Sequence, residues 1–260
     1  MELIDTHCHL DVADFDADRG EVLARTRASG VRRLVIPGVD APHWRTLLAL
    51  CREQGGLYPA LGLHPVYLEQ HRQEDVDALE AAVAQHRPVA VGEIGLDFFV
   101  AGLDRERQQR LFEAQLAVAR NADLPVILHA RKSHDQVLAT LRRMRVRGGI
   151  AHAFNGSLQQ ARQYLELGFV LGFGGTLTYP RSSRIRALAK ALPVEAIVLE
   201  TDAPDMPVAA HRGERNSPEY LPDCLQALAE VRDADAALLA AQTTRNACAV
   251  LRLAETPGGP

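Results

Sequence analysis

Short apolar runs alternate with amphipathic stretches along most of this chain. The runs are rich in valine, isoleucine and leucine and mostly lack a regular polar alternation, which is typical of strands buried on both faces. They span residues 2–7, 33–39, 57–64, 88–97, 125–130, 148–154, 169–175 and 196–203. The pattern therefore predicts eight buried strands.

The stretches between these runs predict helices. Residues 21–29 stop before Gly30, which suits a helix C-cap, and Ser157 precedes another amphipathic stretch as a predicted N-cap. The longest helix between strands is predicted over 105–122, and further helix is predicted from Pro218 to Leu253. Each predicted strand is therefore followed by helix.

Eight alternations within 260 residues favour an α/β fold, a single (β/α)8 barrel of the TIM type with extra C-terminal helix. An open doubly wound sheet is the alternative. No Pro/Gly/Ser-rich linker or change in composition divides the chain. We therefore expect one domain over residues 1–254 and a flexible tail over 255–260.

Charge, cysteine content and hydrophobic pattern indicate where the protein is expected to occur and which kinds of surface it is expected to lack. The 29 basic and 33 acidic residues give a net charge of −4, which argues against a broad basic surface for nucleic acid. The four cysteines are scattered, as expected for free thiols in a reducing cytosol. Glu2 and Asp5 stand where a secretory signal needs apolar residues, and no apolar run approaches a membrane span of about 18 residues. We expect a cytoplasmic protein with no membrane association and no obligate protein partner.

Histidines and carboxylates gather where the predicted strands end, which is the catalytic face of barrel enzymes. The six candidates, in chain order, are His7, His9, Glu93, His129, His152 and Asp202. Four imidazoles and two carboxylates suit Zn²⁺, Mn²⁺, Ni²⁺ or Co²⁺, and Mg²⁺ less well. The sequence therefore predicts a metal centre at this end of the barrel.

Strand geometry divides the six candidates into two half-sites. In a strand, positions i and i+2 point the same way, so His7 and His9 are predicted to share one cation while Cys8 faces away. His129 and His152, on neighbouring strands, are predicted to hold a second cation. Glu93 lies between the two pairs around the ring and can bridge them through its two oxygens, and Asp202 completes the first site.

Several blocks of this sequence resemble the TatD family of metal-dependent deoxyribonucleases, which belong to the amidohydrolase-like barrels. The blocks are D-T-H-C-H-L-D, G-L-H-P, V-G-E-I-G-L-D, P-V-I-L-H-A-R and L-E-T-D-A-P. G-G-T-L-T-Y-P and L-E-T-D-A-P-D-M-P resemble the YjjV-like branch of the family. The resemblance implies the same six metal ligands, with Glu93 in the place of the carboxylated lysine of other amidohydrolases.

The resulting hypothesis is hydrolysis of a phosphodiester in DNA or a small molecule, by two divalent cations about 3.5–4 Å apart that activate a bridging water. Zn²⁺, Mn²⁺, Mg²⁺, Ni²⁺ and Co²⁺ remain open as the cation. Asp202 is the candidate to orient the water and take its proton, and Glu93 is the second catalytic carboxylate.

Three basic residues are candidate substrate contacts. His64, in G-L-H-P, is interpreted as a phosphate or leaving-group contact, with a capped structural histidine as the alternative. Arg131 directly follows the fifth strand. Arg215, like Arg212, lies in the loop 211–218 after the eighth strand, where barrels often place phosphate sites.

Two other functions stay open from the sequence. An amidohydrolase could use the same centre on an amide, lactone or aminoacyl ester, although Glu93 and the lack of an arginine cluster for a substrate carboxylate disfavour it. A barrel that binds metal and acts through a partner without turnover is disfavoured by the complete ligand set.

Overall fold

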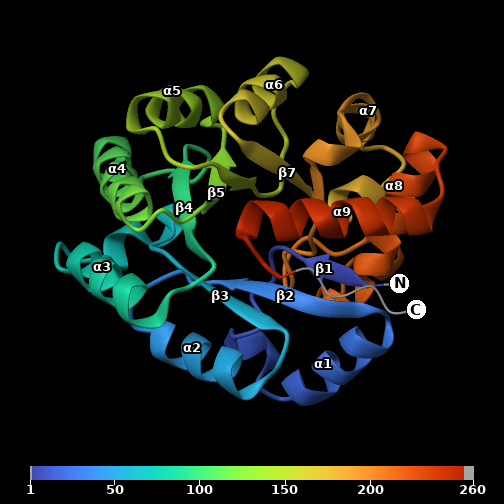
Figure 1. Cartoon of the computed structure of the whole chain (residues 1–260), viewed down its shortest axis with the longest axis horizontal. Helices are drawn as coiled ribbons and strands as arrows, with labels where there is room; N and C mark the ends of the chain where they lie inside the picture. The colour runs from blue at the N-terminus through green and yellow to red at the C-terminus, as the bar shows by residue number, and fades with distance from the viewer. Residues whose placement is uncertain (1, 255–260) are drawn as a thin grey trace.

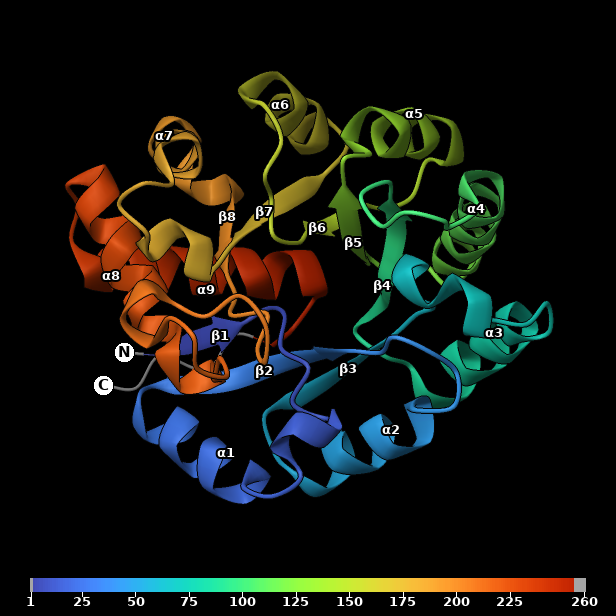
Figure 2. The ribbon, with the colours of Figure 1, turned by 180° about the vertical axis from the view of Figure 1, so that it is seen from behind.

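Eight parallel strands form one sheet in the computed structural model, which describes residues 2–254. Strands that are neighbours in the chain are neighbours in space, from β1 to β8 (Figures 1 and 2). They are β1 (Leu3–Asp5), β2 (Val31–Pro37), β3 (Leu57–Leu61), β4 (Ala90–Asp97), β5 (Val126–Arg131), β6 (Gly149–Ala151), β7 (Phe169–Phe173) and β8 (Ile197–Leu199).

Backbone hydrogen bonds join the first and eighth strands just beyond their ends. The Thr6 N–H donates to the Leu199 carbonyl (3.0 Å), and the Asp202 N–H donates to the His7 carbonyl (2.8 Å). The predicted (β/α)8 barrel is thus confirmed. The doubly wound alternative is wrong, because such a sheet reverses its strand order in the middle.

Helices pack around the outside of the strands (Figure 1). They are α1 (Arg19–Ala28), α2 (Trp44–Glu53), α3 (Asp75–His86), α4 (Arg105–Asn121), α5 (His134–Met144), α6 (Leu158–Glu166), α7 (Ser183–Ala191), α8 (Leu221–Arg232) and α9 (Ala236–Leu251). The extra C-terminal helix is present, but the predicted stretch 218–253 is divided. Asp233 adopts a left-handed backbone (φ 49°) that ends α8, and the Asp235 carboxylate caps α9 by accepting from the Ala237 and Leu238 N–H groups.

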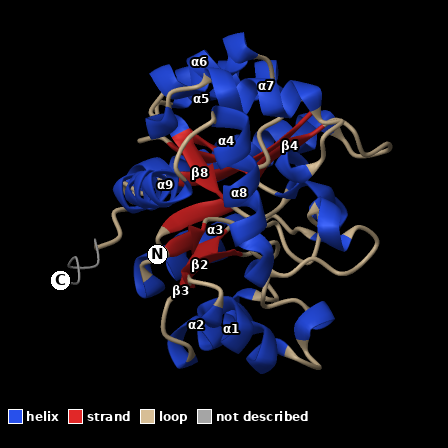
Figure 3. Ribbon diagram, turned by 90° about the vertical axis from the view of Figure 1, so that its right-hand side faces the viewer, coloured by secondary structure: helices blue, strands red, loops and turns tan. Residues whose placement is uncertain are grey.

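The extra helix α9 lies across the N-terminal end of the barrel, opposite the long loops (Figure 3). Its Ala247, Cys248 and Leu251 side chains join a buried cluster with one apolar residue from each of seven strands. Those residues are Ile4, Val35, Ala60, Ala90, Ile127, Ile150 and Val198. The helix therefore closes one end of the barrel interior and leaves the other end for a site.

This role of α9 predicts that Leu251→Ala destabilises the protein. Leu251 is 2% exposed, and truncation of such a buried leucine costs about 2–5 kcal/mol in free energy of unfolding. The matched control is Leu238→Ala on the same helix, where the side chain is 72% exposed and the expected cost is below about 0.5 kcal/mol. Chemical denaturation measures both values. Equal stability of the two variants would contradict the packing described here.

Several strands are shorter than predicted at their C-terminal ends. β1 ends at Asp5, β6 at Ala151 and β8 at Leu199. The predicted site residues that follow these strands therefore lie in loops. No helix within residues 2–254 is long and apolar enough to cross a membrane, and the predicted tail lies outside the described residues. The cytoplasmic location stays a prediction.

Candidate metal centre

A cavity of about 940 Å³ opens at the C-terminal ends of the strands. Its lining includes His64, Arg131 and five of the six predicted metal ligands. The sixth, His7, is fully buried. The structure thus brings residues from β4, β5 and the segments that follow β1, β3, β6 and β8 to one place, as the sequence predicted.

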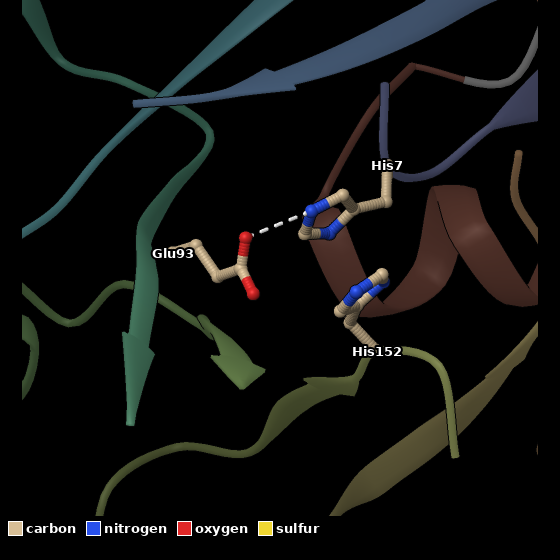
Figure 4. Close-up of side chains that lie close together, drawn as sticks. All are labelled: His7, Glu93 and His152. Carbon is tan, nitrogen blue, oxygen red and sulfur yellow. Dashed lines mark ion pairs between the residues drawn. The ribbon is translucent and has the colours of Figure 1, made fainter. Parts of the chain in front are cut away.

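The Glu93 carboxylate lies at the centre of this group, and each of its oxygens faces a different pair of imidazoles. Oε2 is 3.0 Å from His7 Nε2 and 3.5 Å from His9 Nε2. Oε1 is 2.9 Å from His129 Nδ1 and 3.2 Å from His64 Nε2. Figure 4 shows Glu93 reaching from β4 towards His7 across the barrel. One carboxylate therefore connects two clusters of nitrogen donors.

Asp202 and His152 complete the cluster around His7. Asp202 Oδ1 is 3.6 Å from His7 Nε2 and 3.7 Å from His9 Nε2, and Asp202 Oδ2 is 3.6 Å from His152 Nε2. The rings of His7 and His152 stack with centroids 3.6 Å apart (Figure 4). His152 therefore lies on the His7 side of Glu93.

This arrangement differs from the predicted second half-site, which paired His129 with His152. His129 instead faces His64, with His129 Nδ1 and His64 Nε2 3.2 Å apart. The sequence interpretation placed His64 outside the ligand set because four other histidines were enough. His64 follows β3, next to β4, so its ring reaches Glu93 directly. His64 lies in the block G-L-H-P, so this block is the sequence feature from which a ligand role for His64 could have been inferred.

Asp5 anchors the segment just beyond β1 that carries His7 and His9. Its Oδ1 accepts hydrogen bonds from the His7 N–H (3.1 Å) and the Thr201 N–H (3.0 Å), and its Oδ2 accepts from the Thr201 hydroxyl. The Nε2 atoms of His7 and His9 meet at 3.2 Å, so the two rings converge as the sequence predicted. Cys8 is buried in the apolar core, as expected.

Asp97 orients His129, and the sequence interpretation gave it no such role. Asp97 Oδ2 lies 2.9 Å from His129 Nε2, while Oδ1 accepts from the Phe99 and Val100 N–H groups. Burial would raise the pKa of Asp97, but His129 and these N–H groups lower it to about 2. The ionised carboxylate can hold the Nε2 proton of His129, which would leave Nδ1 to coordinate a cation beside Glu93.

Asp97→Asn is expected to weaken cation binding about 10–100-fold, because partners of this kind set the tautomer of a ligand histidine. An asparagine Oδ1 can still cap the 99–100 turn, while its NH2 group would force His129 Nε2 to accept a hydrogen bond. His129 Nδ1 would then carry the proton. Calorimetric titration with Mn²⁺ measures the change, with the surface variant Asp123→Asn as control. Unchanged Mn²⁺ affinity would refute the tautomer assignment.

Glu200 supports His152 from the opposite side to the cavity. Glu200 Oε1 is 3.1 Å from His152 Nδ1 and accepts from the Ala153 N–H at 2.6 Å. Gly172 on β7 leaves the room for this carboxylate, since a Cβ there would lie 2.1 Å from Glu200 Oε2. A buried carboxylate thus fixes the His152 ring so that Nε2 faces Asp202.

The pKa values of the buried carboxylates and histidines in this cluster depend on one another. Burial alone would raise the pKa of Glu93, but His64, His7 and His129 hold it well below its usual range. Burial lowers the pKa of His7, with His152 adding to this effect. Burial would also lower the pKa of His152, yet Glu200 and Asp202 raise it to about 10. Because metal ligands must be deprotonated, a cation that binds here displaces protons.

The donor set fits divalent cations. Three groups each have their donor atoms within 4.8 Å of one another, namely His7–Glu93–His152, His7–His9–Asp202 and His64–Glu93–His129. Two pairs of imidazole nitrogens lie only 3.2 Å apart, and both pairs surround an ionised carboxylate. Mixed imidazole and carboxylate donors of this kind suit Zn²⁺ and Mn²⁺.

The two predicted arginine contacts have different surroundings. Arg131 lines the cavity, with its guanidinium carbon 3.7 Å from the centroid of the Phe99 ring. Arg215 is not among the lining residues of the cavity. Its guanidinium donates to both oxygens of Asp18 and lies over the Phe15 ring, so the structure does not bring Arg215 together with the other site residues.

The fold and this centre define a barrel of the metal-dependent hydrolase class. A family model described as TatD related DNase matches residues 4–252. The chain therefore belongs to the TatD family, and the predicted family is confirmed. Relatives in this family are named as metal-dependent hydrolases, and the histidine and carboxylate clusters of this chain could bind metal.

The chain is similar in sequence and in structure to the protein YjjV. It is 44% identical to the uncharacterized metal-dependent hydrolase YjjV of Escherichia coli K12, over 88% of this chain and 90% of that protein. The crystal structure of YjjV from the same organism superposes with a TM-score of 0.92 at 41% identity, covering 95% of this chain and 97% of that one. The 3'-5' ssDNA/RNA exonuclease TatD of Klebsiella pneumoniae is 33% identical, over 94% of this chain and 95% of that protein.

Proposed function

We propose that this chain is a phosphodiesterase that hydrolyses DNA, or a small phosphodiester, at a binuclear divalent-metal centre. The observation that carries the proposal is the Glu93 carboxylate, whose Oε2 faces His7 and His9 while Oε1 faces His64 and His129. A carboxylate with separate nitrogen donors at each oxygen has the arrangement needed to bridge two cations.

We assign the ligands by proximity to each oxygen. His7, His9 and Asp202 would hold the first cation, with His152 beside them, and His64 and His129 would hold the second. Bound divalent cations would stabilise negative charge on the phosphate and lower the pKa of the attacking water. Nickel, cobalt, zinc, manganese and magnesium all remain candidates for this donor set.

The protein's own groups perform the remaining steps. Asp202 lines the cavity, and burial raises its pKa to about 6, although His152 and His9 oppose the rise. As a ligand of a bound cation Asp202 would be ionised, and its carboxylate can accept the proton of the attacking water. Arg131 at the cavity wall would contact a phosphate of the substrate strand, and its planar guanidinium suits two phosphate oxygens at once.

The relatives support a nucleic-acid substrate. The Klebsiella protein is named as a 3'-5' exonuclease of single-stranded DNA and RNA, and it matches this chain over nearly the whole length of both. The cavity, at about 940 Å³, has room for a mononucleotide unit at the end of a strand. Single-stranded DNA is therefore the first substrate to test.

A substrate panel tests the proposed reaction. The purified full chain is incubated with Mn²⁺ or Mg²⁺ and single- or double-stranded DNA of defined ends, bis(p-nitrophenyl) phosphate, an amide, a lactone and an aminoacyl ester. We expect hydrolysis of the phosphodiesters. Turnover of the carbonyl substrates alone would contradict the proposal and favour the amidohydrolase alternative.

A further inference from the structure

Phe99, Arg131 and Lys132 form an aromatic and cationic group beside the cavity, which we call the rim patch. The Phe99 side chain is 50% exposed, an unusual state for so large an apolar group. The Arg131 guanidinium carbon lies 3.7 Å, and the Lys132 Nζ 4.7 Å, from the centroid of its ring. The patch combines an exposed ring with two charges that attract phosphate.

The two cations of the rim patch have no carboxylate partner. Among the described residues, neither Arg131 nor Lys132 forms an ion pair or a side-chain hydrogen bond, and both are exposed. Other arginines, such as Arg45, Arg52 and Arg181, also have no ion pair among the described residues, and Arg131 differs from them because it lines the cavity. The donors of the rim patch are therefore available to a ligand.

The patch is fixed to the candidate metal centre through its backbone. Asp97 accepts a hydrogen bond from the Phe99 N–H with one oxygen and faces His129 with the other. Asp97 and Arg131 are also register partners on β4 and β5, and Arg131 lines the cavity itself. A ligand at the patch is thus held at a defined position relative to the reacting phosphate.

A second exposed aromatic side chain lies in the cavity wall. Tyr67 is 40% exposed and meets the edge of the His64 ring, with centroids 5.8 Å apart. The large hydrophobic side chains that are exposed within residues 2–254 are Tyr67, Phe99 and Leu238. Tyr67 lines the cavity and Phe99 lies against Arg131, which also lines it, so both rings are near where an unpaired base could stack.

We propose that the rim patch binds the nucleotide next to the one being cleaved, with its base against Phe99 and its phosphate on Arg131 and Lys132. This inference rests on the proposed phosphodiesterase function and adds a binding site for the neighbouring nucleotide, formed by named residues of this chain. A base inside a duplex is paired and stacked, so the aromatic side chain can stack only on an unpaired base. Every base has a flat aromatic face, so this contact does not depend on the sequence. The patch therefore selects single-stranded nucleic acid without reading its sequence.

The first test compares an oligonucleotide with a substrate too small to reach the patch. We expect Phe99→Ala to lower the ratio of kcat/KM for single-stranded DNA to kcat/KM for bis(p-nitrophenyl) phosphate about tenfold, the usual size of a lost stacking contact. Phe99→Tyr should restore the ratio and Phe99→Leu should not. Leu238→Ala removes an exposed apolar side chain elsewhere and should leave the ratio at the wild-type value. A ratio within about twofold of wild type for Phe99→Ala would overturn the inference.

The second test separates the patch from the reaction. Binding of a fluorescent single-stranded oligonucleotide to the full chain is measured by anisotropy in chelator, where no hydrolysis is needed. Phe99→Ala should raise the Kd about tenfold for a normal oligonucleotide, but not for one with an abasic nucleotide at the contacted position. An equal effect of the variant on both oligonucleotides, or none on either, would overturn the inference. If Phe99→Ala weakens binding as expected but the protein hydrolyses no phosphodiester, the proposed function is refuted and the binding site at the rim patch stands.

Discussion

Replacement of Glu93 by alanine is expected to lower kcat for a phosphodiester by about 10³-fold or more, since a cation's stabilisation of the transition state amounts to several kcal/mol. Glu93 is 2% exposed, and its two oxygens contact four imidazoles. Its removal leaves both nitrogen clusters without their shared negative charge. We therefore expect the bound metal to fall together with the rate.

The measurement is metal content by plasma mass spectrometry together with hydrolysis of single-stranded DNA. Glu93→Gln is a second variant that keeps the side-chain volume, and chemical denaturation of both variants separates loss of metal from loss of folding. Glu113→Ala, at a surface carboxylate that pairs with Arg143, is the control and should behave as wild type. Metal stoichiometry unchanged in Glu93→Ala would refute the bridging role.

Asp202→Asn is expected to keep much of the bound metal and to lose about 10²–10⁴-fold in kcat, the usual contribution of a positioned proton acceptor. Asparagine retains an oxygen that can face the cluster, but it cannot accept a proton at neutral pH. Asp202 has a left-handed backbone (φ 60°), which asparagine tolerates as well as aspartate does. The backbone hydrogen bond from residue 202 to the His7 carbonyl is also preserved.

The matched control for this variant is Asp233→Asn. Asp233 has a similar left-handed backbone (φ 49°) at the end of α8, so the control tests whether the exchange itself disturbs such a position. Single-turnover hydrolysis of DNA and metal content are measured for both variants. A near-normal rate for Asp202→Asn would remove Asp202 as the proton acceptor.

The barrel could be predicted from the sequence because its strands are buried on both faces and appear as uninterrupted apolar runs. The strand ends were less accurate. The runs around His7, His152 and Asp202 continue past β1, β6 and β8, whose ends depend on interstrand hydrogen bonds that the pattern does not show. The boundary between α8 and α9 was missed because a single left-handed residue, Asp233, leaves little signal in an otherwise helical stretch.

The six candidate ligands could be predicted from their positions at successive strand ends, and the structure brings all six together. The contact between His64 and His129 could not, since it depends on side-chain reach across the barrel. The sharing of one cation by His129 and His152 stays a prediction. The role of Asp97 depends on which ring nitrogen of His129 it meets. The substrate contact of Arg215 stays a prediction, and the position of its loop in the chain gave no sign of the ion pair with Asp18.

The most direct test of a binuclear phosphodiesterase is a metal titration followed by activity. The full chain is stripped with a chelator, dialysed and titrated with Mn²⁺ while cleavage of an end-labelled single-stranded oligonucleotide is recorded. We predict no cleavage by the stripped protein and a rate that reaches its maximum at about two equivalents of Mn²⁺ per chain. Cleavage that persists in the chelator, or none at any Mn²⁺ concentration, would contradict the account.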